Sequence, residues 1–230
     1  MKLLEATMEE VGGKVGLLPI GSVEQHGPHL PMGTDSIIAE EVARRVEERF
    51  PEHVLLFPTL YVGCSMEHKG FPFLGVRYVT MVNYLLDLLE SSKSLNLRGL
   101  VIVNGHGGNE SVLDIVQREF NFSSPPFKVH VVNLVGKDAH LFGNVDLHAG
   151  SAETSKMKAI RPSLVREHKL REVKDTSVKE GIFSEITTYE ASPHGIINDG
   201  DVEVNEDKGR VSIEKAVEEI SEFIRKKYLR

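Results

Sequence analysis

The sequence lacks several features, and each absence excludes a class of protein. Among its 230 residues there is one cysteine, Cys64, so no disulfide within the chain is available to hold the fold together. No run approaches the roughly 18 apolar residues that a membrane-spanning helix needs. The N-terminal stretch MKLLEATMEEV carries acids where a secretory signal peptide has an apolar core. We therefore expect a cytoplasmic protein without a membrane anchor.

Positive charge is also scarce. The 27 lysines and arginines are outnumbered by 34 aspartates and glutamates, which gives a net charge of -7, and no basic tract interrupts the sequence. An acidic chain of this kind is not typical of proteins that bind nucleic acid or anionic membranes. We expect a small-molecule substrate instead.

Short apolar runs alternate with amphipathic segments along the chain. The pattern predicts buried strands at 15–20, 54–57, 100–103 and 129–134, and helices at 37–50, 80–94, 110–120, 151–160 and 211–224. This alternation is typical of an α/β fold, a three-layer α/β/α arrangement with a mostly parallel sheet. No repeat or linker divides the chain, so we expect one domain over residues 1–230. The weakly periodic, charged stretch 170–208 predicts irregular structure or a lid.

The first polar motif, GSVEQHGPHLPMGTD at residues 21–35, follows the first expected strand. It carries the carboxylate or imidazole groups of Glu24, His26, His29 and Asp35. Alternate residues of an extended segment point the same way, and the glycines and prolines could turn the chain so that Asp35 returns to the others. Imidazole and carboxylate ligands suit Zn²⁺, Mn²⁺ or Fe²⁺. The same spacing also fits a polar loop in which Asp35 caps the following helix.

The second motif, NGHGGN at residues 104–109, follows the third expected strand and precedes a helix. Its three glycines surround His106 and permit tight turns and close approach of the backbone. One interpretation is a turn whose amides face an anion at the helix N-terminus. The histidine at its centre favours a metal ligand instead.

The third motif, DLHAGSAETS at residues 146–155, places His148 before a turn of small residues and Glu153 after it. The pair could supply a proton shuttle and a further metal ligand. Taken alone, Glu153 is equally well explained as an acid in the first turn of a helix, where the helix dipole favours negative charge.

In this order, the three motifs resemble those of the creatininase family of metal-dependent amidohydrolases. The resemblance implies two divalent ions per chain, Zn, Fe or Mn. Glu24 and His106 would bind one ion, His26 would bind the other, and Asp35 would bridge them. His148 matches a family histidine that handles protons at the reacting nitrogen. The family also implies a homo-oligomer built from dimers, commonly a hexamer.

The chain departs from the creatininase pattern at Gly108, where creatininase itself has an acid that completes the shell of the second ion. Glu153 is the substitute we expect, both as a ligand and as a group that orients the nucleophile. Gly107 and Gly108 would then border the substrate. His68 lies in a stretch that matches the family's EH…FP loop, so we expect it to contact substrate as well.

The resemblance predicts hydrolysis of a non-peptide C–N bond, in an amide, formamide or cyclic amide, by metal-activated water. In creatininase, tryptophans close over the creatinine ring, and this chain has none. Another branch of the family removes the formyl group of a formylaminopyrimidine ribonucleotide in flavin and deazaflavin synthesis. Its phosphate would require cations, for which Lys69, Arg77 and Lys137 are candidates unless they are ordinary surface charges. A third branch trims a C-terminal dipeptide during maturation of a peptide-derived redox cofactor.

Two further hypotheses stay open. The missing acid at Gly108 would allow a metal- or ligand-binding protein of this fold without catalysis. A cysteine nucleophile, Cys64 activated by His68, is disfavoured because no third group is evident to orient the histidine.

Overall fold

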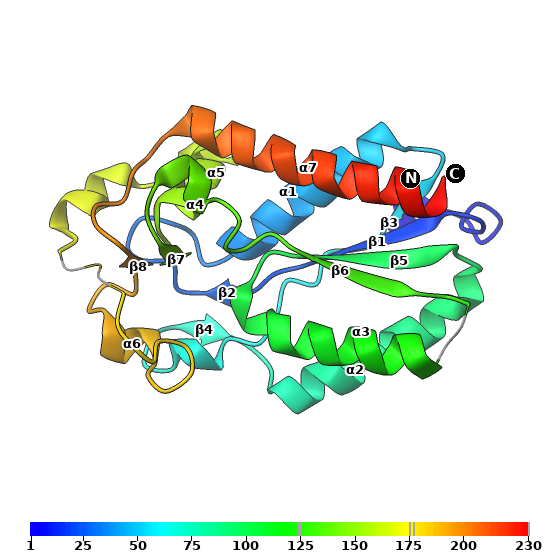
Figure 1. The fold of residues 1–230 in the computed structure, drawn as a ribbon, viewed down its shortest axis with the longest axis horizontal. Coiled ribbons are helices and arrows are strands. Elements are labelled where there is room, and N and C mark those ends of the chain that lie inside the picture. Colours follow the sequence, from blue (N-terminus) through cyan, green and yellow to red (C-terminus); the bar gives the residue numbers. More distant parts are fainter. Residues whose placement is uncertain (124–125, 175, 177, 230) are drawn as a thin grey trace.

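A parallel sheet forms the centre of the molecule (Figure 1). The computed structural model describes residues 1–123, 126–174, 176 and 178–229. Within these residues the sheet has four strands in the order β3-β1-β5-β6, all parallel. Their bounds are Val54–Leu56 for β3, Val15–Ile20 for β1, Gly99–Asn104 for β5 and Val129–Asn133 for β6.

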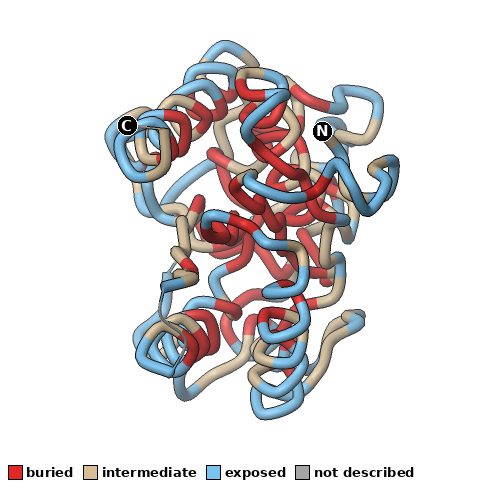
Figure 2. Tube along the Cα trace, turned by 90° about the vertical axis from the view of Figure 1, so that its right-hand side faces the viewer, coloured by how far each residue is buried: buried red, intermediate tan, exposed pale blue. Residues whose placement is uncertain are grey.

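Helices cover both faces of this sheet, which is the three-layer arrangement that the sequence predicts. One face carries α1 (Thr34–Arg49), α5 (Ser151–Ile160) and α7 (Glu206–Tyr228). The other carries α2 (Tyr78–Ser92) and α3 (Glu110–Ser123). Figure 2 shows buried residues running through the middle of the molecule between exposed outer surfaces.

The strand residues divide between these two faces by alternation. In β1, Leu17 packs in the core cluster that contains α1 and α7, whereas Leu18 packs in the cluster that contains α2 and α3. In β5, Val101 and Ile102 divide in the same way. Because successive side chains of a strand point to opposite faces, each central strand supplies both cores, and its sequence is apolar except for Asn104 at the end of β5.

Smaller elements gather near the carboxyl ends of the strands. Two antiparallel ribbons pair β2 (Val23–Glu24) with β4 (Phe73–Leu74), and β7 (Asp146–His148) with β8 (Ile197–Asn198). Short α-helices are α4 (Ala139–Phe142) and α6 (Thr188–Ala191). Turns of 3-10 helix lie at Leu3–Glu5, Met66–His68, Lys93–Leu95, Gly107–Asn109, Pro162–Leu164 and Glu167–Glu172.

The structure differs from the predicted element boundaries in places that matter for the site. Helix α1 begins at Thr34, so Asp35 lies inside its first turn and is not its N-cap. The segment 170–208 is largely irregular as predicted, but it contains α6, which begins with a capping box between Thr187 and Glu190. Residues 175 and 177 of this segment lie outside the described residues. In the part of the chain that the structure describes, no helix is both long and apolar enough to cross a bilayer.

Helix α7 packs directly on α5, and Gly209 makes this contact close. A Cβ atom on Gly209 would lie 2.0 Å from the Ser155 carbonyl oxygen and 2.8 Å from the Lys156 amide nitrogen. Both neighbours are backbone atoms, so neither can move aside without shifting α5.

We predict that Gly209→Ala destabilises the protein by about 1–3 kcal/mol, because the overpacking outweighs the better helix propensity of alanine. Urea unfolding measures this change. Gly12→Ala is the control, since a Cβ atom on Gly12 would come no nearer than 3.8 Å to the Asn96 side chain. Equal stability of the two variants would contradict the packing argument.

Candidate metal centre

The first two motifs meet because β1 and β5 are adjacent and parallel. Ile20 pairs with Asn104 at the ends of the two strands, so the residues that follow each strand emerge side by side. The first turn of α1 lies against both strand ends. A Cβ atom on Gly21 would lie 2.4 Å from the Ser36 amide nitrogen, and one on Gly105 would lie 2.4 Å from the Asp35 carbonyl oxygen. Glycine at both positions therefore lets the helix bring Asp35 into the site.

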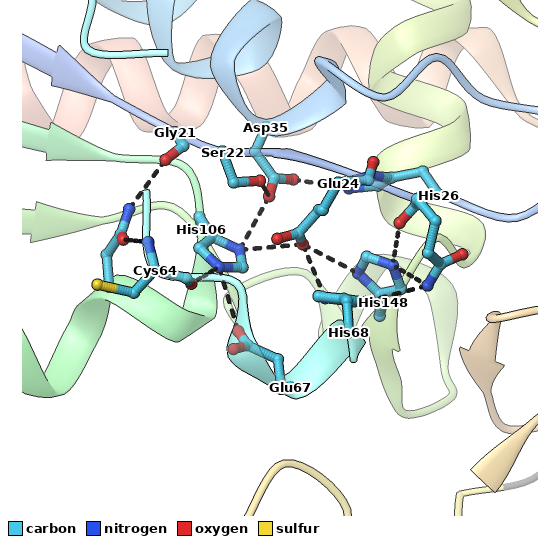
Figure 3. A network of polar contacts seen from close by, with 12 residues as sticks. Gly21, Ser22, Glu24, His26, Asp35, Cys64, Glu67, His68, His106 and His148 are labelled. Carbon is cyan, nitrogen blue, oxygen red and sulfur yellow. Dashed lines mark hydrogen bonds and ion pairs between the residues drawn. The ribbon is translucent and has the colours of Figure 1, made fainter. Parts of the chain in front are cut away.

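Glu24, Asp35 and His106 form one potential metal-binding group (Figure 3). His106 Nδ1 lies 3.0 Å from Asp35 Oδ2 and 3.2 Å from Glu24 Oε1. All three residues are buried. Two carboxylates and an imidazole facing one point are suitable ligands for a divalent transition metal.

His26, His148 and Glu153 form a second group beside the first. His26 Nε2 lies 2.9 Å from Asp35 Oδ1 and 3.7 Å from Glu153 Oε2. Asp35 thus directs one oxygen at His106 and the other at His26. That is the placement a bridging carboxylate requires, and Glu153 lies where a further ligand of the second ion would be needed.

A third group joins Glu24 to His68 and His148. His68 Nε2 lies 2.9 Å from Glu24 Oε1, and His148 Nδ1 lies 3.8 Å from the same oxygen. Gln25 lies behind these histidines, with its side-chain nitrogen 3.1 Å from His68 Nδ1 and 2.9 Å from the Gly195 carbonyl oxygen. His68, expected to contact substrate, is therefore buried within the cluster.

Glu24 provides the test of whether a cation fits here. Its side chain is 0% exposed, and neither carboxylate oxygen has a hydrogen-bond partner of good geometry. A buried, charged carboxylate without hydrogen bonds raises the free energy of the folded state unless a nearby cation compensates its charge. A divalent metal held by Glu24 together with Asp35 and His106 would meet this requirement.

The cluster strongly shifts the proton affinity of its members. Burial would lower the pKa of His26, but the surrounding carboxylates, Asp35 first, outweigh it and raise this pKa to about 10. Burial would raise the pKa of Asp35, yet His26 and His106 hold it well below its ordinary value. For Glu153, burial and the nearby Asp35 raise the pKa to about 8. Such opposed shifts within one cavity are typical of functional sites.

A cavity of about 850 Å³ opens beside the cluster. Its lining includes Asp35, Glu67, His68, His106, Gly107, Gly108, His148 and Glu153. Apolar side chains, among them Val82, Ile115 and Phe183, line other parts of it. The predicted substrate-binding residues thus share one space with the metal-binding groups.

The family model described as creatinine amidohydrolase, Creatininase, matches residues 3–224. The chain belongs to the creatininase family. It is 36% identical over 156 residues to the mycofactocin precursor peptide peptidase of Mycolicibacterium smegmatis. This match covers 64% of this chain and 58% of that protein. It is 29% identical to the creatinine amidohydrolase of Pseudomonas putida, with 67% of each chain covered. The chain thus spans about three fifths to two thirds of the length of these relatives.

Solved creatininases share the fold across the whole chain. A creatininase in a Mn form has a TM-score of 0.81 and 26% identity, and the match covers 99% of this chain and 98% of that one. A mutant creatininase of Zn-Zn type has a TM-score of 0.80 at 26% identity, with the same coverage. The α/β fold predicted from the sequence is the creatininase fold.

Two candidate residues from the sequence, His29 and Cys64, do not belong to the metal-binding groups of this creatininase-family chain. His29 lies outside the metal-binding groups, and its Nε2 is 2.8 Å from Thr154 Oγ1, so it contacts α5 from behind the site. Cys64 is buried, and burial raises the pKa of its thiol to about 11, which removes the basis for a thiolate nucleophile. Its carbonyl oxygen accepts a hydrogen bond from His106 Nε2 at 2.7 Å.

The candidate phosphate-binding cations also lie apart from the cavity. Lys69 and Arg77 are exposed, and Lys137 pairs with Glu219 at 2.7 Å. Among the described residues, no lysine or arginine lines the 850 Å³ cavity.

Three residues of the site were not predicted from the sequence: Gln25, Glu67 and Asn109. Asn109 accepts a hydrogen bond from the Cys64 amide at 2.9 Å and donates one to the Gly21 carbonyl oxygen at 3.0 Å. Glu67 lies with Oε1 3.2 Å from His106 Nε2. Gln25 and Asn109 lie inside the motifs, but amides are less evident candidates than charged groups. Glu67 lies in a separate loop, next to His68.

We predict that Asp35→Asn lowers the affinity for both divalent ions by more than about 100-fold, because one carboxylate faces both groups of ligands. Isothermal titration with Zn²⁺ or Mn²⁺ measures the two affinities. Glu110→Gln is the control, since Glu110 lines the cavity but belongs to none of the three groups. Retention of both affinities in Asp35→Asn would show that Asp35 is not the bridge.

We also predict that metal binding at pH 7 releases protons. The pKa of His26 is raised to about 10 and that of His106 is raised well above its ordinary value, so both are protonated in the metal-free protein. Ligand atoms must lose their protons to bind a metal, and Glu153, with a pKa raised to about 8, is also largely protonated at pH 7. About one proton should therefore leave with the ion held by Glu24, Asp35 and His106, and up to two with the ion held by His26, Asp35 and Glu153. Titrations in buffers of different ionisation enthalpy measure this number. A binding enthalpy independent of the buffer would contradict the assignment of the two histidines.

Proposed function

We propose that the protein is a metal-dependent hydrolase that cleaves an amide-type C–N bond. The observation that carries the proposal is the placement of Asp35, which lines the cavity and whose two oxygens face two adjacent groups of metal ligands. Glu24, Asp35 and His106 would hold one ion. His26, Asp35 and Glu153 would hold the other.

Two divalent ions so placed would lower the pKa of bound water toward ~7 and polarise the carbonyl oxygen of the substrate. Hydrogen bonds from the rest of the chain orient the metal ligands. His26 Nδ1 lies 3.0 Å from the Glu24 carbonyl oxygen and donates a hydrogen bond to it. This bond orients the ring with Nε2 toward Asp35 and Glu153. Such contacts behind the ligands are typical of metal sites.

His148 is suited to move a proton. Its Nε2 lies 2.7 Å from the Gln25 carbonyl oxygen, and a proton on Nε2 would donate to that acceptor. Nδ1 then keeps its lone pair, which faces Glu24. Burial lowers the pKa of His148 well below its ordinary value, and His68 and His26 lower it further, so the ring is neutral at neutral pH. A neutral imidazole at this position can accept a proton and then protonate the departing nitrogen.

The cavity favours a substrate in which apolar groups flank the scissile amide. Its walls carry Val82, Ile115 and Phe183, its charged residues are acidic or histidine, and no lysine or arginine of the described chain lines it. A phosphorylated substrate gains no counter-charge from such walls. Mycobacterial relatives at 35% and 36% identity are named as peptidases of a precursor peptide. We propose the C-terminal end of a peptide as the first substrate class to test.

Deformylation is the second candidate. A relative in Methanothermobacter thermautotrophicus, 32% identical over 151 residues, is named as a formylaminopyrimidine ribonucleotide deformylase. A panel assay with Zn²⁺, Mn²⁺ and Fe²⁺ would compare amine release from apolar C-terminal peptides, formate release from the formylated nucleotide, and creatinine hydrolysis. Turnover of the peptide alone supports the first candidate. Turnover of none of the three with any metal contradicts the proposed hydrolase function for these classes.

On any substrate that is turned over, we predict that His148→Ala lowers kcat by about 10²–10⁴-fold, because general acid–base help is lost. Metal content, measured by elemental analysis, should stay at the wild-type level, since Asp35 and its partners remain. His168→Ala, at an exposed histidine outside the site, serves as the control. A His148→Ala variant with wild-type kcat would exclude His148 from the proton transfer.

A further inference from the structure

The space beside Gly108 is occupied by a carboxylate from another loop. A Cβ atom on Gly108 would lie 2.0 Å from Glu67 Oε1, 2.5 Å from His106 Nε2 and 2.5 Å from the Cys64 carbonyl oxygen. These are far shorter than non-bonded contacts. Glycine at this position therefore leaves room for the Glu67 carboxylate and the His106 ring to lie next to each other.

The loop that carries Glu67 is fixed in place from several sides. Asn109 binds the Cys64 amide and the Gly21 carbonyl oxygen, so it joins this loop to the end of β1. Glu67 itself lies in the 3-10 turn Met66–His68. Thr188 Oγ1 lies 3.4 Å from the Glu67 carbonyl oxygen, within reach for a long hydrogen bond from α6. The position of the carboxylate is thus set by the surrounding fold.

Glu67 faces the side of His106 that points away from the metal-binding group. His106 Nδ1 lies 3.0 Å from Asp35 Oδ2, whereas Nε2 lies 3.2 Å from Glu67 Oε1 and 2.7 Å from the Cys64 carbonyl oxygen. The other oxygen, Glu67 Oε2, is buried without a hydrogen-bond partner. A carboxylate behind a histidine ligand holds the proton on the distal nitrogen, fixes the ring orientation and makes the proximal nitrogen a stronger donor.

We infer that Glu67 is a positioning residue for His106 and raises the affinity of the ion held by Glu24, Asp35 and His106. The inference rests on the proposed metal site, and it gives Glu67 a role distinct from the substrate contact that the sequence predicts for its neighbour His68. Glycine at 108 is a structural requirement of the arrangement, because any side chain there would separate Glu67 from His106.

The test is a calorimetric titration of the full chain with Zn²⁺ and with Mn²⁺. We expect Glu67→Gln to weaken one of two binding steps by about 10–100-fold, because the neutral amide cannot supply the charge that strengthens the ligand. Glu153→Gln should weaken the other step, since Glu153 faces His26. Glu67→Asp should recover part of the lost affinity. Met66→Ala, an exposed neighbour in the same turn, should bind as the wild type does.

Two further readouts separate this role from a structural one. The metal-free Glu67→Gln variant should still unfold in one cooperative urea transition, because the amide keeps the shape of the side chain, with a midpoint lowered only by the loss of the contact with protonated His106. The visible spectrum of the Co²⁺-loaded variant should shift, since the donor strength of a ligand has changed. Wild-type affinity in Glu67→Gln for both ions overturns the inference. A wild-type protein that binds neither metal overturns the proposed function instead.

Discussion

The whole site depends on the close contact between the first turn of α1 and the ends of two parallel strands. Gly21 and Gly105 lack the side chains that would prevent this contact. The first turn of α1 therefore lies close enough to the strand ends for Asp35 to face both His26 and His106. Ser22 Oγ donates a hydrogen bond to Asp35 Oδ2 at 2.8 Å, which fixes the carboxylate further. A shift of the helix by the width of one methyl group would move the central ligand away from both groups.

This arrangement concentrates ionisable groups in a place where water is excluded. Glu24, His26, Asp35, His68, His106 and His148 are all buried. The metal-free protein compensates part of the cost by pairing protonated histidines with carboxylates. Glu24 contacts His68 and His106 through one oxygen, but neither of its oxygens has a hydrogen-bond partner of good geometry. The folded state is therefore arranged for cations that the chain itself does not supply. Metal binding should then contribute to stability as well as to chemistry, because the ions bind the native arrangement and not the unfolded chain.

Much of the fold could be predicted from local sequence. A few neighbouring residues are enough to predict the strands β1 and β5 from their apolar runs. The same holds for the turn around His106, which its glycines indicate. The ribbons β2–β4 and β7–β8 could not be predicted, because two- and three-residue strands have no periodicity and depend on pairing across the fold. Glu67 was not predicted for a related reason. Its contact with His106 depends on the lack of a side chain at Gly108, which becomes apparent only in the folded chain. That residues 1–230 form one domain, and that copies of the chain assemble, remain predictions.

The central claim is that one carboxylate bridges two ions at the carboxyl ends of β1 and β5. Anomalous X-ray scattering from crystals grown with Zn²⁺ or Mn²⁺, recorded at the absorption edge of the metal, tests it most directly. The account predicts two peaks about 3.5–4 Å apart. One peak would lie among Glu24, Asp35 and His106, and the other among His26, Asp35 and Glu153. A single peak, or peaks that do not share Asp35, would contradict the account.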